Sequence, residues 1–128
     1  MNLKTRLDNL YKKLVFSLAS SDSFIYIAFY KYFYKPSAGS LSEFINNFSE
    51  ENPGLQFVQV GANDGYNRDP FAKFIKRDKW KGVLIEPQKY VYETFLRKLY
   101  QNSNRIKTFN YALDAKKGNR TMYRLSFS

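Results

Sequence analysis

Two short apolar segments separated by a helical pattern constrain the fold more than any other feature of the sequence. Residues 55–60 and residues 81–85 each read as a β-strand, and the second is almost uninterrupted by polar side chains. Between them, Phe71, Phe74 and Ile75 recur at helical spacing. A strand, a helix and a second strand in this order predict parallel pairing through a right-handed crossover.

The same alternation continues along the chain and predicts an α/β fold of the Rossmann type. The further elements expected are a helix over residues 92–99, a strand over 106–113, a turn at 114–118 and a fourth strand over 121–127. The predicted architecture is an incomplete parallel sheet with helices on both faces. Asp69 is expected to cap the helix between the first two strands, with Pro70 at its first position.

Ahead of the first strand the sequence predicts three helices. The first spans residues 3–19 with leucines at helical spacing, the second spans residues 23–34, and residues 35–39 form a linker. A capping box of Ser40 and Glu43 starts the third helix. Its one buried face is expected to comprise Leu41, Phe44, Ile45 and Phe48. The chain thus divides into an N-terminal helical segment, residues 1–39, and an α/β domain, residues 40–128.

The side chains that the sequence lacks exclude several classes of enzyme. None of the 128 residues is cysteine or histidine. Disulfides, thiolate nucleophiles, zinc sites and histidine-based catalytic triads are therefore excluded, and no metal site is expected. The absence of cysteine is compatible with a reducing compartment, and a cytoplasmic location is expected.

The excess of basic side chains indicates either general solubility or an anionic partner. The net charge is +10, and six basic but only two acidic side chains lie within residues 1–35. No recognised nucleic-acid-binding motif accompanies the charge, so no specific nucleic acid is expected as a partner. Polar residues interrupt the aromatic stretch at 14–34, so this stretch is not apolar enough to span a membrane. Residues 1–35 are expected either to lie on a membrane surface or to pack on a domain or partner.

A loop after the first strand and an acid after the second form a candidate cofactor site. The loop, residues 61–65, leaves the carboxyl end of a strand, where α/β sheets bind ligands. Its glycines, Gly61 and Gly65, permit a sharp turn or a close approach, although packing alone also selects glycine. Glu86 follows about twenty residues later, where an acid accepts hydrogen bonds from ribose hydroxyls. The alternative role for Glu86 is to cap the next helix.

These motifs together resemble those of a known enzyme family. They are residues 57–65, Asp69 with Pro70, residues 80–87 and residues 110–113 near Gly118. In this order they resemble the FkbM family of S-adenosylmethionine-dependent methyltransferases over roughly residues 55–127. The resemblance implies a class I methyltransferase fold with S-adenosylmethionine as cofactor. It does not clearly extend to residues 1–40.

The resemblance also implies which residues bind the cofactor. The loop would wrap its amino-acid end, Asp64 would hold its ammonium or the loop itself, and Glu86 would bind its ribose. Gln59 stands where many members carry an aspartate, and Tyr111 and Ala112 fall where the chain passes the adenine. The implied cofactor-binding residues are Gln59, Gly61, Ala62, Asn63, Asp64, Gly65, Glu86 and Ala112. No catalytic residue is identified.

The implied reaction is O-methylation of a hydroxyl group on a sugar, glycan or natural product. Fewer strands are predicted than such a sheet contains, so the chain is expected to be the N-terminal, cofactor-binding part of the domain. Two alternatives remain open: a non-catalytic module that binds a nucleotide cofactor or a partner, and an NAD-type domain, which the loop spacing disfavours. An incomplete sheet is expected to attract a partner or a second copy at its open edge.

Overall fold

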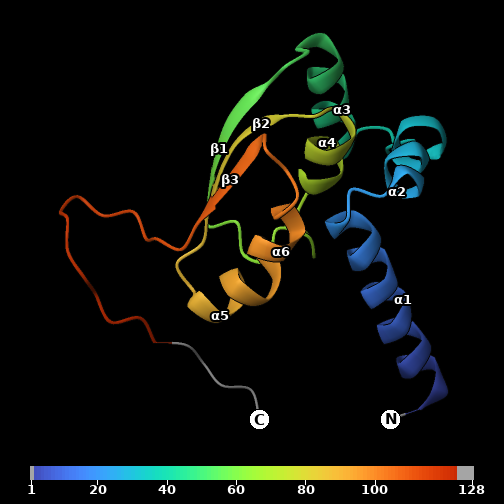
Figure 1. Cartoon of the computed structure of the whole chain (residues 1–128). Coiled ribbons are helices and arrows are strands. Elements are labelled where there is room, and N and C mark those ends of the chain that lie inside the picture. The colour runs from blue at the N-terminus through green and yellow to red at the C-terminus, as the bar shows by residue number, and fades with distance from the viewer. Residues whose placement is uncertain (1, 124–128) are drawn as a thin grey trace.

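The computed structural model describes residues 2–123 and contains a three-stranded parallel sheet (Figure 1). The strands are β1 (Gln56–Val60), β2 (Lys81–Ile85) and β3 (Ile106–Phe109), paired in the order β1-β2-β3. Val58 lies beside Val83, and Gly82 lies beside Ile106. The prediction of an α/β chain with a parallel sheet is confirmed, and this open sheet is compatible with a Rossmann-like fold.

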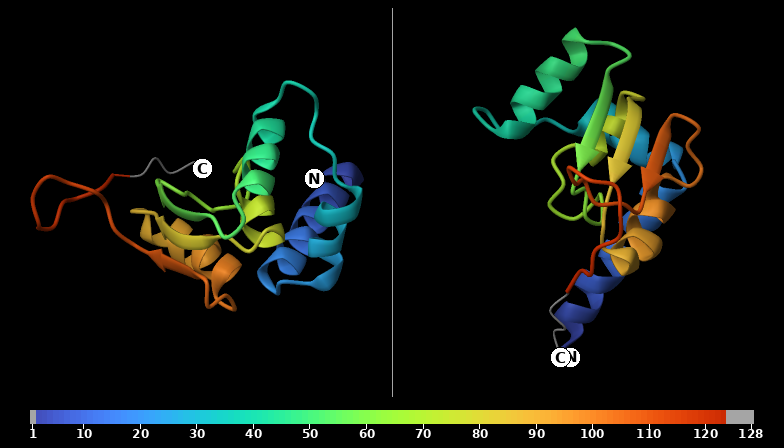
Figure 2. Two further views of the ribbon diagram at one scale, coloured as in Figure 1. Left: turned by 90° about the horizontal axis from the view of Figure 1, so that it is seen from above. Right: turned by 90° about the vertical axis from the view of Figure 1, so that its left-hand side faces the viewer.

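Helices cover one face of this sheet, and the prediction of helices on both faces is wrong for the described residues. The covering helices are α4 (Ala72–Arg77), α5 (Lys89–Val91), the π-helix η2 (Tyr92–Leu96) and α6 (Arg97–Tyr100). Two right-handed crossovers that step in the same direction place their helices on the same face. On the other face Val58 and Val60 are exposed, and the strands lie in front of the helices in Figure 2, right.

The core lies between the sheet and these helices. Its fully buried large side chains are Phe74, Ile75, Leu84, Leu96 and Leu99. Trp80 is also buried, packs its ring against Phe57, and donates a 2.8 Å hydrogen bond from Nε1 to Ser49 Oγ. Trp80 is thus a core residue, and its bond to Ser49 joins the core to the helix that precedes the sheet.

Two N-terminal helices pack against the domain, and each leaves much of its surface exposed. They are α1 (Leu3–Ser20) and α2 (Phe24–Ala28), and the π-helix η1 (Phe29–Phe33) continues α2. Ala19 and Tyr26 belong to the same buried cluster as Phe74 and Leu84. The rest of α1 extends away from the sheet (Figure 1). Within the described residues, none of the helices combines the length and the apolar character needed to cross a membrane.

The helix α3 (Leu41–Glu51) corrects the prediction of one buried apolar face. Of its four apolar residues only Ile45 is buried, whereas Leu41, Phe44 and Phe48 are exposed and the two phenylalanine rings stack on each other. The helix meets the domain along Ile45 and Ser49 instead, because Ser49 Oγ bonds to both Trp80 and Asp78.

Local signals at helix and strand ends are confirmed in part. Ser40 Oγ accepts a hydrogen bond from the Glu43 amide, but the Glu43 carboxylate bonds to the amide of Gly39 rather than that of Ser40. The helix α4 begins at Ala72, two residues beyond the predicted start at Pro70. The strand β3 ends at Phe109, four residues earlier than predicted. Residues 121–123 are irregular, and the rest of the predicted fourth strand lies outside the described residues.

Candidate functional site

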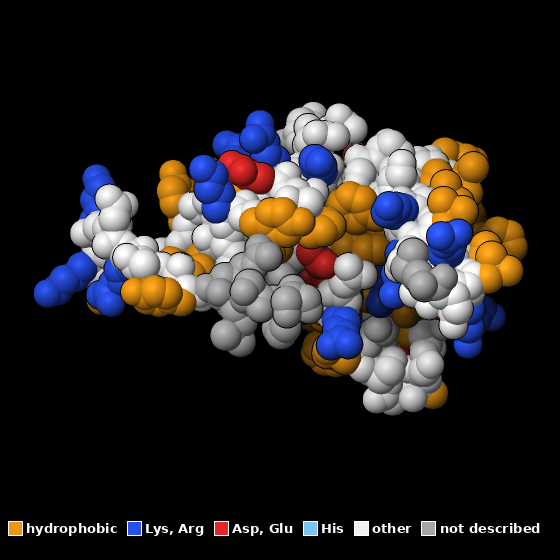
Figure 3. Space-filling view, turned by 90° about the horizontal axis from the view of Figure 1, so that it is seen from below, with side chains coloured by type: hydrophobic (Ala, Val, Ile, Leu, Met, Phe, Trp, Pro, Cys, Tyr) orange, Lys and Arg blue, Asp and Glu red, His pale blue; other side chains and the backbone are white. Residues whose placement is uncertain are grey.

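The loop at residues 61–65 lies at the carboxyl edge of the sheet, where all three parallel strands end. The amides of Gly61 and Ala62 both donate to the carbonyl of Ile85, at 2.9 and 3.0 Å. The loop therefore folds back over the end of β2, which brings it beside Glu86. The strand ends point in the same direction in Figure 2, right, and Figure 3 views the molecule from that side.

Glu86 joins the loop to the start of the next helix. Its Oε2 accepts a 2.8 Å hydrogen bond from the amide of Asn63, and its Oε1 accepts a 2.9 Å bond from the amide of Gln88. Glu86 is only 3% exposed. An ionised carboxylate offers about four acceptor positions, so two remain beyond these bonds. The contact to Gln88 lies just before α5, where it holds the N-cap residue of that helix, and the burial of Glu86 separates its unused positions from solvent.

Asp64 stabilises the loop through its own side chain. Its Oδ1 accepts hydrogen bonds from the amides of Tyr66 and Asn67, both at 2.8 Å, and its Oδ2 accepts one from Asn67 Nδ2. This arrangement is an Asx-type turn. Asp64 therefore holds the loop itself, which was one of the two roles expected for it.

Gln59 projects from β1 toward the helices and pairs with Asp69. Its Nε2 donates a 2.7 Å hydrogen bond to Asp69 Oδ2, so Oε1 is the atom that points elsewhere. Gln59 Oε1 is buried, and no donor among the described residues reaches it. Buried acceptors without a donor are rare in folded proteins and often mark a place for water or a ligand.

Asp69 accepts three hydrogen bonds from within the protein. Besides its bond to Gln59, its Oδ1 accepts from the amides of Phe71 and Ala72, at 2.7 and 3.0 Å. These amides lie at the start of α4, so Asp69 stabilises the entry to that helix, but the N-cap residue is Phe71 and not Asp69 as the sequence predicted. Sequence reasoning missed the pairing with Gln59, because the two residues meet only through the fold.

The two glycines of the loop have different surroundings. Both have positive φ, +70° at Gly61 and +74° at Gly65. A Cβ added to Gly65 would lie 2.6 Å from Leu96 Cδ1, whereas a Cβ added to Gly61 would meet no atom within 4 Å. Gly65 is therefore required by packing against η2, and Gly61 is the glycine whose open side a ligand can approach.

The neighbouring residues differ in how close they come to this edge. Asn110 donates through Nδ2 to the carbonyls of Glu86 and Pro87, at 2.8 and 3.0 Å, which fixes the end of β3 beside the site. The sequence predicted a strand through this position and therefore gave no signal for this role. Ala112 lies exposed in the irregular segment that follows, and the exposed ring of Tyr111 stacks on Phe109. Ala62 is buried in the core cluster.

Tyr66, which follows the loop, faces the N-terminal helix instead of the strand ends. Its ring meets that of Phe16 in α1 at 5.6 Å in an edge-on geometry. Burial raises the pKa of Tyr66 to about 12, and the neighbouring Tyr30 and Tyr11 add to the shift. Tyr66 thus anchors the loop to α1.

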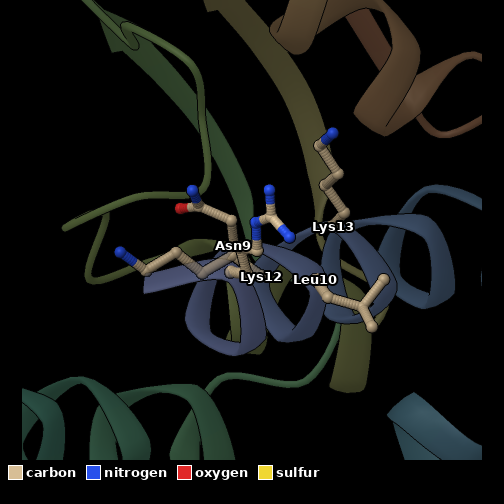
Figure 4. A pocket seen from close by; sticks show the side chains of 5 residues that line it. Asn9, Leu10, Lys12 and Lys13 are labelled. Carbon is tan, nitrogen blue, oxygen red and sulfur yellow. The ribbon is translucent and has the colours of Figure 1, made fainter. Parts of the chain in front are cut away.

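Three surface hollows lie away from the loop. One is formed by residues of α1 alone, among them Leu10, Lys12 and Lys13 (Figure 4). The second lies between α3 and β1, and the third lies over residues shared by β1 and β2. The candidate site is therefore a surface edge of the sheet rather than one of these hollows.

No cluster of three or more acidic side chains that could hold a metal ion occurs among residues 2–123. What the edge offers instead is an acceptor set: a carboxylate with unused positions, an unpaired amide oxygen and an open glycine backbone. Such a set suits a ligand that carries an ammonium group and hydroxyl groups.

Comparison of the chain with protein-family models, with curated proteins and with solved structures finds no match.

Proposed function

We propose that the chain binds S-adenosylmethionine at this edge of the sheet and acts in the O-methylation of a sugar, glycan or natural-product hydroxyl, as the resemblance to the FkbM family implies. The observation that carries the proposal is the unpaired, buried Oε1 of Gln59 at the end of β1. A ligand ammonium would supply the missing donor there. An unsatisfied buried acceptor costs about 1–3 kcal/mol, so filling it contributes to ligand affinity.

The residues of the edge divide the binding task. Gly61 and Asn63 would accommodate the amino-acid end of the cofactor, because the backbone at Gly61 is open on one side. Glu86 would accept hydrogen bonds from ribose hydroxyls through the two acceptor positions that the loop and helix amides leave unused. Glu86 must become more exposed to do so, because it is buried in this structure.

The chemistry of the proposed cofactor sets what the protein needs to supply. The sulfonium of S-adenosylmethionine makes its methyl group electrophilic, so the protein mainly positions the methyl and the acceptor in line. The chain offers neither histidine nor cysteine as a base. Asp69, the acid nearest to Gln59, is committed to the amides at the start of α4 and leaves no free role as a base in this structure.

Calorimetric titration of S-adenosylmethionine into the purified chain tests the proposal. Gln59→Leu and Glu86→Gln should each weaken binding by about tenfold or more, the loss of one hydrogen bond to a charged group. Glu93→Gln is the matched control, since it removes an equal charge from an exposed position on η2 and should leave affinity unchanged.

Circular dichroism on each variant separates loss of binding from loss of fold. A wild-type sample with native helix content that releases no heat on titration contradicts the proposal. Equal weakening by Glu86→Gln and Glu93→Gln contradicts the role of Glu86, because a general charge effect would then explain both.

A second candidate function is that of an interaction module, and the uncovered face of the sheet favours it. Val58, Val60 and Phe109 are exposed on that face. The edge strand β1 contains no charged residue and no proline, the usual features that prevent edge-to-edge pairing. Its occupant would be a second copy of this chain, paired through β1.

A further inference from the structure

The helix α1 carries a stripe of leucines that the rest of the described chain does not cover. Leu3, Leu7, Leu10 and Leu14 are 56% to 73% exposed. At about 100° per residue they fall within an arc of about 60° on the helix surface. The side chains by which α1 packs on the core, Val15, Phe16, Leu18 and Ala19, lie in its last two turns, and most of them face away from the stripe. The stripe is therefore not a core-facing surface of this fold.

Basic side chains border the leucine stripe on both sides. Helical geometry places Lys4 on one flank, and Arg6 and Lys13 on the other. Figure 4 shows the side chain of Leu10 pointing away from those of Lys12 and Lys13. The acid in this part of α1, Asp8, falls outside the stripe, so its charge does not interrupt the apolar surface.

The following helices extend the exposed apolar surface with aromatic residues. Phe24, Ile25, Phe29 and Phe33 are all half or more exposed on α2 and η1. Lys31 lies among them with its ammonium 5.4 Å from the Tyr32 ring centre. In Figure 3 hydrophobic side chains gather along the side of the molecule that the N-terminal helices form, with Lys and Arg beside them.

Charge decides which partner suits this surface. An apolar stripe between basic flanks, followed by exposed aromatic rings, matches a lipid bilayer with anionic headgroups, where leucines enter the acyl boundary and lysines reach the phosphates. A second copy of α1 is a poorer match for this stripe, because its own basic flanks would repel those of the first. Three acidic residues, Glu43, Glu50 and Glu51, lie together on the short α3.

We propose that α1 lies flat on an anionic membrane surface through its leucine stripe, and that the exposed aromatic residues of α2 and η1 add to this contact. The domain would then be held close to the bilayer, with α1 as the point of attachment. This inference is independent of the cofactor site, because no residue of α1 takes part in that site.

Flotation of the full chain with vesicles tests the inference. The chain should float with vesicles of phosphatidylcholine and phosphatidylserine, bind weakly to vesicles of phosphatidylcholine alone, and be released by high salt. Leu7→Ser combined with Leu10→Ser should reduce binding by about tenfold or more. Lys4→Gln combined with Lys13→Gln should reduce it by about 25-fold, about fivefold for each charge.

A matched control uses leucines of similar exposure elsewhere. Leu41→Ser combined with Leu113→Ser alters residues that are 61% and 67% exposed and should leave vesicle binding unchanged. Circular dichroism verifies that α1 still folds in each variant. The inference is overturned by a folded wild-type chain that ignores anionic vesicles, or by equal loss in both leucine pairs. It is also overturned by self-association without vesicles that Leu7→Ser and Leu10→Ser abolish, since a second copy then covers the stripe.

Discussion

Lys76 Nζ lies 2.6 Å from Asp22 Oδ1, and this ion pair connects α4 to the turn between α1 and α2. Lys76 is 2% exposed and also donates a 2.7 Å hydrogen bond to the carbonyl of Leu99. Burial lowers the pKa of Lys76, and the hydrogen bond and charge of Asp22 oppose that shift. The pair therefore both fixes the N-terminal helices to the domain and keeps a buried cation compensated.

Removal of the Asp22 charge should destabilise the fold strongly. Asp22→Asn should lower the free energy of unfolding by about 3 kcal/mol, because the buried ammonium of Lys76 loses its counter-ion. Asparagine tolerates the positive φ of 51° at this position, so the backbone is preserved. Urea denaturation measures the difference.

Two further variants show whether the effect comes from burial. Lys76→Met should cost less than Asp22→Asn, since it leaves only a partly exposed carboxylate unpaired. Asp114→Asn removes an acid that pairs with the exposed Arg120 and should change stability by less than about 0.5 kcal/mol. Equal losses from Asp22→Asn and Asp114→Asn would show that burial of Lys76 adds nothing.

Stability should fall as the pH rises above about 10. Burial raises the pKa values of Tyr26, Tyr66 and Tyr100, that of Tyr66 to about 12. Above their ordinary pKa of about 10 these residues ionise in the unfolded chain but stay protonated in the fold, so the unfolded state binds fewer protons and is favoured. The lowered pKa of Lys76 has the opposite effect: it makes stability rise with pH up to about pH 10.5. This is one group against three tyrosines, so the net stability should still fall. Thermal unfolding from pH 7 to pH 11 should show this decline.

Tyr100→Phe tests one of these tyrosines directly. Its hydroxyl is buried, and none of the described residues provides it with a hydrogen-bond partner. Removing an unsatisfied hydroxyl should leave stability at pH 7 equal or slightly higher, and it should make the alkaline decline less steep. A large loss of stability at pH 7 would mean that the hydroxyl has a partner in solution.

Gly65→Ala should destabilise the protein more than Gly61→Ala does. At Gly65 the new Cβ meets the buried Leu96 at 2.6 Å and Leu99 at 3.3 Å, and φ is positive, so a loss of about 3 kcal/mol is expected. At Gly61 only the positive φ opposes alanine, at about 1 kcal/mol. Chemical denaturation of both variants measures the two losses of stability. A loss at Gly65 no larger than that at Gly61 would show that η2 does not pack on the loop.

Pairing through β1 should appear as concentration-dependent dimer formation. Light scattering after size exclusion should detect the dimer, and Val58→Lys should abolish it by placing a charge on the strand. Leu113→Lys, which adds the same charge at a similarly exposed position outside the sheet, is the control. A monomer at all concentrations removes the support for the interaction module.

The predictions from the sequence were most accurate where the signal is local. The strand at 56–60, the loop glycines and the cap at Ser40 depend on spacing within a few residues, and the structure contains all three. The apolar face of α3 was predicted to be buried because its periodicity is correct for a helix. Periodicity shows only that one face is apolar, and not whether another element lies against it.

The contacts between distant residues could not be predicted from one sequence. Gln59 meets Asp69, Glu86 meets the amide of Asn63, and Lys76 meets Asp22 only after the crossovers have placed their elements side by side.

The amino-acid pattern of this chain therefore specifies its order of strands and helices, its loop at the carboxyl edge and the acid after the second strand. Folding in three dimensions specifies which acid is used for capping, which acceptor remains unpaired and which faces stay open. The reason is physical: backbone preferences act between neighbours in the chain, whereas burial and hydrogen-bond pairing depend on residues brought together from distant parts of it.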